Sequence, residues 1–210
     1  MAVSLKKNES VSLSKAVEEL ANLTIGLGWD VAKRGHSIDC DSSVIVLTGN
    51  NKPKSKGMLG GLFKKAEENT GVGTLQRTSD VVYFGNRRHS SGCIYHNGDN
   101  LTGAGDGDDE QINVNLKDMP ADVKRIVVVV NIYACRSRGQ HFGMIDNCYA
   151  RIVDNGTRKE ICRYNLSEDY SGKTAMILGE LYRENNEWHF KAIGEGTTDA
   201  DIKSLAARYE

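Results

Sequence analysis

Acidic residues and glycines alternate in one stretch of the sequence in a way that suits metal binding. Between Asp99 and Glu110 the chain carries five carboxylates and no lysine or arginine. Two carboxylates ~5 Å apart repel by about 3 kcal/mol at an effective dielectric near 20, so packing five of them on one loop calls for a counter-ion. Glycines allow sharp bends, and Ca²⁺ takes roughly six to eight hard oxygen ligands. The stretch therefore predicts a calcium-binding loop.

A second acidic pair, Asp39 and Asp41, lies far upstream. If this segment is extended, both side chains point to the same face. Because loops of a β-sandwich meet at its ends, we hypothesise that this pair and the Asp99–Glu110 loop share Ca²⁺. The carboxylates outnumber the needs of one ion, which suggests two. The alternative is a solvated acidic loop, with Asp41 as a turn or cap residue.

Other catalytic and metal chemistry finds little support in the sequence. The acidic run does not fit the EF-hand pattern, because Gln111 stands where glycine is required. No HExxH motif, no zinc spacing and no phosphate-binding glycine loop occurs. The alternative function is a metal-dependent hydrolase or phosphoesterase that uses the same carboxylates. The only basic clamp for its substrate would come from Arg87, Arg88, Arg136 and Arg138.

The elements that must position these residues read mostly as short strands. Ile112, Val114 and Leu116 alternate with polar residues, as in a half-buried strand, and Ile126–Ile132 is a continuous apolar run typical of a central strand. Residues 184–187 form a short polar link that predicts a hairpin. Spacing and length favour one all-β domain over residues 1–210, an antiparallel β-sandwich of two sheets. A short C-terminal helix is expected over 198–209, with a capping motif at Thr198.

Residues 50–79 read as a long inserted loop. Within it, 57–65 combines apolar residues with flanking lysines and glycines. Two interpretations stay open: a flexible loop with a frayed helix, or a segment that contacts a membrane surface or a partner.

Bulk composition narrows the class of protein. The formal net charge of -1 argues against a nucleic-acid binder, which would carry a basic stripe. Five widely spaced cysteines without a CxxC motif read as buried, reduced thiols. The first residues lack a signal-peptide hydrophobic region, so we expect a cytoplasmic protein.

The sequence resembles the TerD family of tellurite-resistance and general-stress proteins along nearly its whole length. The opening residues 3–5 and 11–15 look like the family's doubled start, followed by Gly26–Asp30 and Ile38–Asp41. The long run from Gly98 to Glu110 is the most specific match. Later matches lie at residues 138–143, 163–169 and 179–183. Two departures stand out: the length of 50–79, and Asn165 where an acid is expected.

The resemblance implies a β-sandwich, calcium binding and a role in resistance to tellurite and other stresses. It does not imply an enzyme. A third interpretation, favoured over catalysis, is a partner-binding module stabilised or switched by Ca²⁺ that docks other stress or tellurite-resistance proteins. The metal ligands that the resemblance carries over are Asp39, Asp41, Asp99, Asn100, Asp106, Asp108, Asp109 and Glu110, with Asp30 as a weaker candidate.

Overall fold

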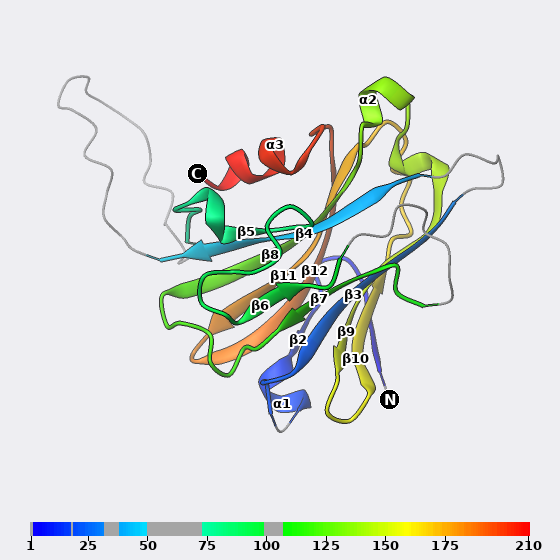
Figure 1. Cartoon of the computed structure of the whole chain (residues 1–210). Coiled ribbons are helices and arrows are strands. Elements are labelled where there is room, and N and C mark those ends of the chain that lie inside the picture. The colour runs from blue at the N-terminus through cyan, green and yellow to red at the C-terminus, as the bar shows by residue number, and fades with distance from the viewer. Residues whose placement is uncertain (1, 18, 32–37, 50–72, 99–106) are drawn as a thin grey trace, which may run out of the picture.

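The fold is a sandwich of two β-sheets (Figure 1). The structure, a computed structural model, describes residues 2–17, 19–31, 38–49, 73–98 and 107–210. Within them, the first sheet has the strand order β1 (Val3–Leu5), β10 (Lys159–Asn165), β9 (Ile145–Asp154), β3 (Leu23–Val31), β7 (Glu110–Val114), β6 (Ile94–His96). The second has the order β2 (Ser10–Ser12), β12 (Glu187–Thr197), β11 (Ala175–Glu184), β8 (Val123–Ile132), β4 (Cys40–Thr48), β5 (Val81–Val82). The predicted antiparallel sandwich is confirmed; β1, which runs parallel to β10, is an exception at one edge.

The doubled start of the chain closes one side of the sandwich. β1 joins the edge of the first sheet, while β2 joins the edge of the second. The chain then forms α1 (Leu13–Ala16), whose Leu13 is fully buried. Each of the two similar segments therefore adds an edge strand, one to each sheet.

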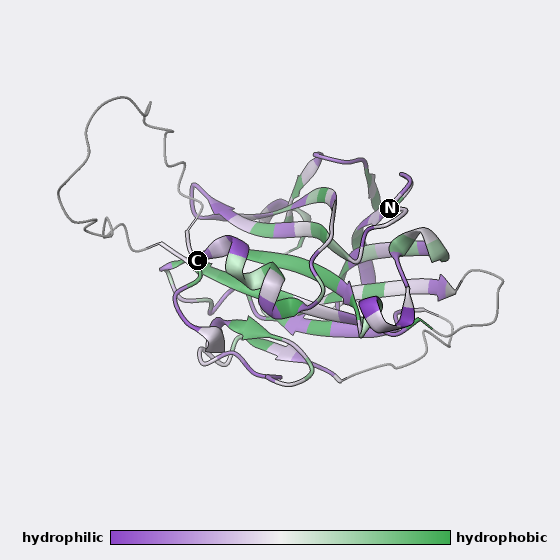
Figure 2. Cartoon of the chain, turned by 90° about the horizontal axis from the view of Figure 1, so that it is seen from above, coloured by the Kyte–Doolittle hydropathy of each residue, from purple (hydrophilic) through white to green (hydrophobic). Residues whose placement is uncertain are grey.

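The apolar run Ile126–Ile132 is a central strand, as predicted, because β8 lies between β11 and β4. Val128 and Val130 pack between the sheets, while Val127 and Val129 belong to a second apolar cluster on the outer face. This outer cluster is completed by Leu205 of α3 (Ile202–Ala206). Figure 2 shows α3 lying along the apolar strands of the second sheet.

The C-terminal helix is shorter than the predicted 198–209. α3 begins at Ile202, and a 3-10 turn, Ala207–Tyr209, continues it. The cap is Asp201 and not Thr198, because the Asp201 carboxylate accepts a hydrogen bond from the Ser204 N–H at 2.7 Å. The Thr-x-x-Asp pattern thus placed the cap three residues too early.

β11 and β12 form the predicted hairpin, with Asn185 and Asn186 at positive φ in its turn. Of the predicted insertion 50–79, residues 50–72, including 57–65, lie outside the described residues. The described residues continue from Gly73; Thr74 pairs with Thr48, and a 3-10 turn, Thr78–Asp80, follows. The remaining helical elements are α2 (Cys135–Arg138) and a 3-10 turn, Phe142–Met144.

Candidate metal site

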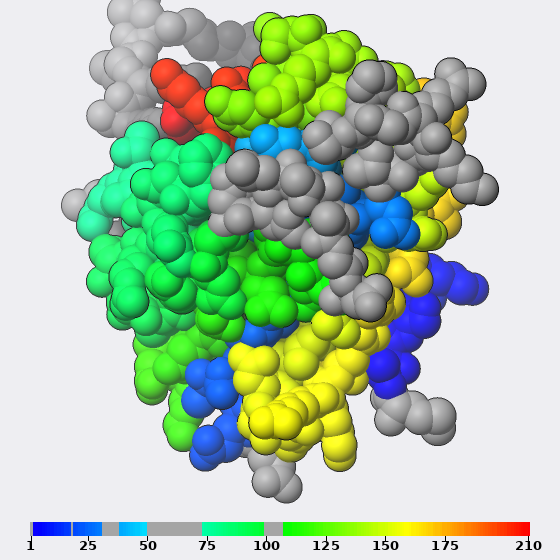
Figure 3. Space-filling model, turned by 45° about the vertical axis from the view of Figure 1, so that its right-hand side comes forward, coloured from blue at the N-terminus to red at the C-terminus, as the bar shows by residue number. Residues whose placement is uncertain are grey.

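Those predicted ligands that the structure describes gather at one end of the sandwich. We call it the acidic end: the end at which β4 and β7 begin and β8 ends. Asp39 and Asp41 flank the first residue of β4, and Asp108 and Asp109 precede β7, which begins with Glu110. Figure 1 shows β4 starting beneath α2. The space-filling view in Figure 3 shows the same segment at the surface below the α2 turn. Asp99, Asn100 and Asp106 lie outside the described residues.

The three consecutive acids at the start of β7, Asp108, Asp109 and Glu110, lie in three different environments. Glu110 points between the sheets with Ile112 and Val114 of the same strand. Asp109 lies at the backbone of β3, where its carboxylate accepts a hydrogen bond from the Trp29 N–H at 2.8 Å. Asp108 turns to the outer face of the first sheet. Gly107, at a φ of +105° that favours glycine, precedes this divergence.

Asp108 is neutralised by Arg151 of β9. The guanidinium donates two hydrogen bonds to its carboxylate, from Nε at 2.7 Å and Nη2 at 3.0 Å, and the Asp108 side chain is only 1% exposed. The Tyr149 hydroxyl and the Gln111 amide donate to the same carboxylate. No lysine or arginine lies within the acidic run itself, but strand pairing brings an arginine 43 residues away to Asp108.

The glycines of β3 make room for this contact. A Cβ on Gly26 would clash with the Asp108 carboxylate, and one on Gly28 would clash with the Tyr149 ring. Arg151 and Tyr149 stand opposite Gly26 and Gly28 in the β3–β9 register. The sequence analysis did not single out Arg151 and Tyr149. A signal was present: Gly26 and Gly28 are two residues apart, as are Tyr149 and Arg151, so two glycines can face two long side chains on a neighbouring strand.

A charge network extends from Asp108 across the outer face. Arg151 also donates to Glu160 at 3.1 Å, and Glu160 accepts from Arg163 at 2.8 Å. The Arg163 guanidinium lies 4.0 Å from the centre of the Tyr149 ring. Hydrogen bonds from Arg163 and Arg151 lower the pKa of Glu160 despite its partial burial. Burial and the Asp108 charge raise the pKa of Tyr149 to about 12.

Glu110 satisfies the backbone of β4 beyond the end of its short neighbour β5. Its carboxylate accepts a hydrogen bond from the Ser42 N–H at 2.6 Å, and its side chain is fully buried. The His96 Nε2 lies 3.7 Å from the same carboxylate and within 3.2 Å of the Ser42 carbonyl and hydroxyl oxygens. Glu110 and His96 of the first sheet thus tie it to β4 of the second sheet at Ser42, which pairs with β8 on its other side.

The fold disfavours the charged forms of Asp39 and Asp109. Burial raises the pKa of each, and the nearby charge of Glu110 raises both further. The Oδ1 of Asp39 is buried without a hydrogen-bond partner, and its Oδ2 lies 3.8 Å from the Arg138 Nη1. Such groups favour a bound cation, because a positive charge would offset the desolvation.

Within the described residues, no three His, Cys, Asp or Glu side chains form a ready-made metal cluster. The donor chemistry of Asp39, Asp41, Asp109 and Glu110 fits Ca²⁺, since all are hard oxygen ligands. Asp108 fits less well, because its two oxygens already accept hydrogen bonds from Arg151. Hence any complete calcium site at the acidic end needs oxygens beyond these acids.

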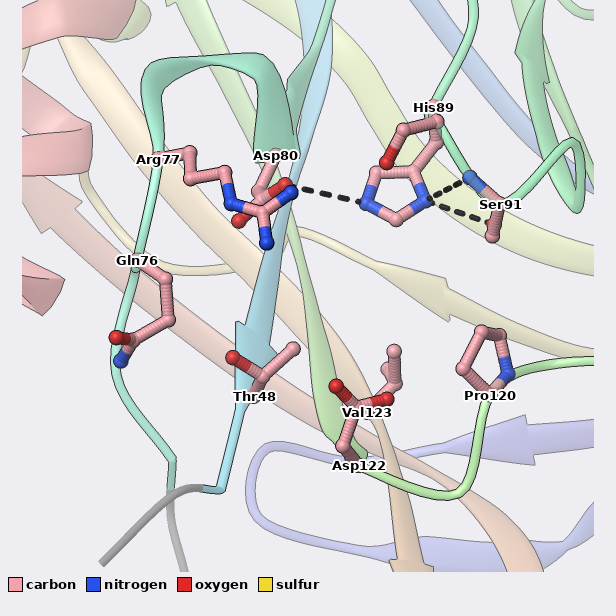
Figure 4. Close-up of a pocket in the computed structure, with 10 residues that line it drawn as sticks. Thr48, Gln76, Arg77, Asp80, His89, Ser91, Pro120, Asp122 and Val123 are labelled. Atoms are coloured by element: carbon pink, nitrogen blue, oxygen red, sulfur yellow. Dashed lines mark hydrogen bonds and ion pairs between the residues drawn. The ribbon is translucent and has the colours of Figure 1, made fainter. Parts of the chain in front are cut away.

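A polar cavity of about 400 Å³ lies at the opposite end of the sandwich, near the end of β4 and the start of β8 (Figure 4). Its wall holds His89, whose Nε2 lies 3.5 Å from Asp80 and whose Nδ1 lies 2.7 Å from the Ser91 hydroxyl. Both ring partners come from its own wall. Burial lowers the pKa of His89 and outweighs the opposing effect of Asp80.

Thiol chemistry is not available at the surface. All five cysteines are buried free thiols, as predicted. Burial raises the pKa of Cys148 and of Cys162 to about 12, so neither thiol ionises readily.

Comparison with known proteins settles the family. The model of the TerD domain matches residues 1–59 and 70–209. The chain belongs to the TerD domain family.

Curated relatives carry stress and tellurium-resistance names. The chain is 38% identical to the "Stress response protein SCP2" of Bacillus subtilis (strain 168), with 100% of both chains covered. It is also 38% identical to the "Tellurium resistance protein TerD" of Serratia marcescens, covering 100% of this chain and 97% of that protein. A third relative, "General stress protein 16U" of Bacillus subtilis (strain 168), is 40% identical over 93% of this chain and 91% of its own. These TerD-domain relatives link the chain to stress response and tellurite resistance.

Solved structures confirm the TerD-like fold. A TerD homologue, SCO6318 from Streptomyces coelicolor A3(2), superposes with a TM-score of 0.61 at 20% identity, covering 89% of this chain and 95% of that one. The protein SAV2460, of unknown function, superposes with a TM-score of 0.64 at 22% identity, covering 90% and 96%. Among the described residues of this TerD-domain chain, no helix is long and apolar enough to cross a membrane.

Proposed function

We propose that this TerD-domain protein binds Ca²⁺ at its acidic end and uses the ion to stabilise or switch a surface that docks other stress or tellurite-resistance proteins. The observation that carries the proposal is the gathering of Asp39, Asp109 and Glu110 from two sheets at one end, where burial raises the pKa of Asp39 and of Asp109. Asp99, Asn100 and Asp106 of the signature loop would supply further oxygens. Two ions are proposed, because the acids outnumber the needs of one.

Each residue of the acidic end has its own part in this proposal. Asp109 and Asp39 would bind the ion directly. Glu110, whose carboxylate already accepts a hydrogen bond from the Ser42 N–H, would contribute its negative charge. Arg151 would position the chain before β7 by fixing Asp108. The ion would offset the cost of burying the charged forms of Asp39 and Asp109.

Calorimetric titration of the metal-free protein with Ca²⁺ and with Mg²⁺ tests the proposal, together with thermal unfolding in Ca²⁺ and in chelator. An ion that binds the native state raises its stability by about 2.7 kcal/mol at 100 times its Kd. We expect heat and thermal stabilisation with Ca²⁺, and weaker binding in Asp109→Asn. The control is Asp118→Asn, an exposed acid at the opposite end. No heat and no stabilisation at millimolar Ca²⁺ would refute calcium binding.

The proposed docking role is tested separately. Other TerD-domain and stress proteins, purified individually, are titrated against this protein in Ca²⁺ and in chelator. Ca²⁺-dependent affinity is expected; equal affinity in both conditions would refute switching. Vesicles with anionic lipid test peripheral membrane contact through 57–65, with a variant lacking 57–65 as the control.

We propose no catalytic activity and a cytoplasmic location. The buried, free thiols support a reducing compartment, and cell fractionation tests it. The hydrolase alternative is tested by incubating phosphatase and nuclease substrates with the protein and Mn²⁺. Turnover that disappears in Asp109→Asn would overturn the non-catalytic proposal.

A further inference from the structure

The polar cavity at the end of the sandwich opposite the acidic end is assembled from segments far apart in the chain. Thr48, the last residue of β4, and Val123, the first of β8, lie in its wall. Asp80 comes from the 3-10 turn before β5, and His89 from the segment between β5 and β6. At about 400 Å³, the cavity falls within the ~300–1,000 Å³ of small-molecule sites in proteins. It is therefore large enough for a small organic molecule.

His89 is held in one orientation and one protonation form. Its backbone N–H donates to the Ile94 carbonyl at 3.1 Å, and its carbonyl accepts from the Gly92 N–H at 2.9 Å. Its Nδ1 accepts from the Ser91 N–H at 3.2 Å. Because a backbone N–H can only donate, neutral His89 carries its ring proton on Nε2. Burial lowers the pKa of His89, which favours this neutral form.

The Nε2–H of His89 lacks a hydrogen-bond acceptor within the described residues. Its side chain is 6% exposed, and the Nε2 atom is buried without a partner. The Asp80 carboxylate lies 3.5 Å away, beyond the range of a good hydrogen bond, and Figure 4 shows the two side chains pointing toward one another. Buried donors are almost always paired. A hydroxyl group satisfies both residues with one atom, because it accepts from Nε2–H and donates to the carboxylate.

The charges around the cavity favour an uncharged ligand. Asp80 and Asp122 are acids, and Arg77 is a permanent cation. All three charges act on His89. Two carboxylates disfavour an anion such as a phosphate, and the arginine disfavours a cation. The wall therefore suits a neutral molecule that both donates and accepts hydrogen bonds.

The remaining wall offers further partners for hydroxyl groups. Thr48 adds a hydroxyl of its own. The Gln76 amide nitrogen donates to the Thr74 hydroxyl, which leaves the Gln76 amide oxygen as an acceptor. Pro120 and Val123 add apolar surface, against which the carbon face of a ring can pack. Several hydroxyls on a compact carbon ring match this combination.

We propose that this cavity binds one uncharged, polyhydroxylated molecule of monosaccharide size, with one of its hydroxyls beside Asp80 and His89. That hydroxyl accepts from the His89 Nε2–H and donates to the Asp80 carboxylate. Because the Nε2 atom is enclosed, the hydroxyl reaches it only when the exposed Arg77 side chain turns aside, and Arg77 then donates to neighbouring hydroxyls. The site is separate from the proposed calcium binding and does not depend on it.

Titrations with ribose, glucose, inositol and the phosphate ester of glucose test the inference. Ligand-detected NMR measures binding, and the nitrogen NMR signals of the His89 ring report where the ligand lies. We expect at least one neutral probe to bind and to shift the Nε2 signal, and the phosphate ester to bind more weakly. No binding by any neutral probe, or tighter binding by the ester, would overturn the inference; a cavity that holds water alone gives the first result.

His89→Phe keeps a planar ring and removes the Nε2 donor, so the Kd of the neutral probe should rise about tenfold or more. His141→Phe is the matched control. The His141 Nδ1 likewise accepts a backbone N–H two residues on, from Gly143 at 3.1 Å, but this histidine lies beside the 3-10 turn Phe142–Met144, away from the cavity. The Kd should stay unchanged in that variant.

Asp122→Asn keeps the test decisive if His89→Phe does not fold, because Asp122 is exposed. Loss of this carboxylate should raise the Kd about threefold. A Kd that stays unchanged in every cavity variant that folds would overturn the inference. None of these outcomes bears on calcium binding at the acidic end.

Discussion

Arg151 decides what Asp108 can contribute to the acidic end. Its bidentate contact holds a carboxylate whose side chain is 1% exposed, and hydrogen bonds to Asp108 raise the pKa of the arginine further above its ordinary value. Asp108 is thus better placed to fix the chain before β7 than to hold an ion. Asp109, one residue on, keeps a carboxylate that burial makes unfavourable in its charged form.

Replacing Arg151 by methionine should lower the free energy of unfolding by about 3 kcal/mol, because it leaves the Asp108 carboxylate buried without its counter-charge. Urea unfolding measures the loss. The double variant with Asp108→Asn should recover much of it, since the two residues are coupled. Lys159→Met, at an exposed position, is the control; an equal loss there would contradict the assignment.

Asp109→Asn should make the calcium-free protein more stable at neutral pH. The fold raises the pKa of Asp109, so the folded state favours its neutral form. The stability from this group is present below the ordinary value of 3.8 and is lost as the pH rises through the folded pKa. Asparagine removes that loss and can still accept the Trp29 hydrogen bond. Thermal unfolding in chelator should show a higher midpoint, and Asp118→Asn should show no change.

At the scale of elements, β4 makes contacts in three directions: with the core, with Glu110 of the first sheet and with β8 on its outer face. Its inward side chains fill the core, its Ser42 N–H donates to Glu110, and Asp41 on its outer face pairs with Asn131. α3 covers the outer face further along, where Ile45 and Leu47 are fully buried. The short α3 depends on its cap, because most of its backbone donors lie in the first turn.

Asp201→Ala should destabilise the protein by about 1 kcal/mol, because the Ser204 N–H loses its acceptor. Thr198→Ala is the matched control, since Thr198 is exposed and precedes the helix by four residues. Its effect should stay within about 0.5 kcal/mol. Chemical denaturation of both variants compares the two positions, and the reverse ranking would restore Thr198 as the cap.

At the scale of the whole molecule, the two ends of the sandwich respond to pH in opposite directions. The acidic end holds carboxylates whose pKa the fold raises. At the other end, burial lowers the pKa of His89, whose surroundings include Asp80, Arg77 and Asp122. The overall pH dependence of stability is the sum of these contributions.

Acidification below the ordinary histidine value of 6.5 should destabilise the protein through His89, because the unfolded chain then binds the proton more readily than the folded one. The stability that this histidine contributes is present above 6.5 and is lost as the pH falls towards its lowered pKa. His89→Gln should flatten this part of the curve of thermal midpoint against pH, measured in chelator. An unchanged slope would show that His89 does not carry the effect.

The sequence by itself determined the family, the class of fold and the most acidic region. Period-two alternation, a continuous apolar run and short polar links record which residues are buried, so they predicted β7, β8 and the β11–β12 hairpin. The signature run from Gly98 to Glu110 carried the family resemblance. These features are local, and each is readable within a few residues.

Only the tertiary structure decided which polar side chains contact one another. Arg151 reaches Asp108, and Asn131 pairs with Asp41, through strand register between segments far apart in the chain. It also separated Asp108, Asp109 and Glu110, three neighbours in sequence, into an outer face, a strand backbone and a buried interior. Spacing along one strand cannot encode these contacts, because the partner strand and its register are set by the packing of the whole sandwich.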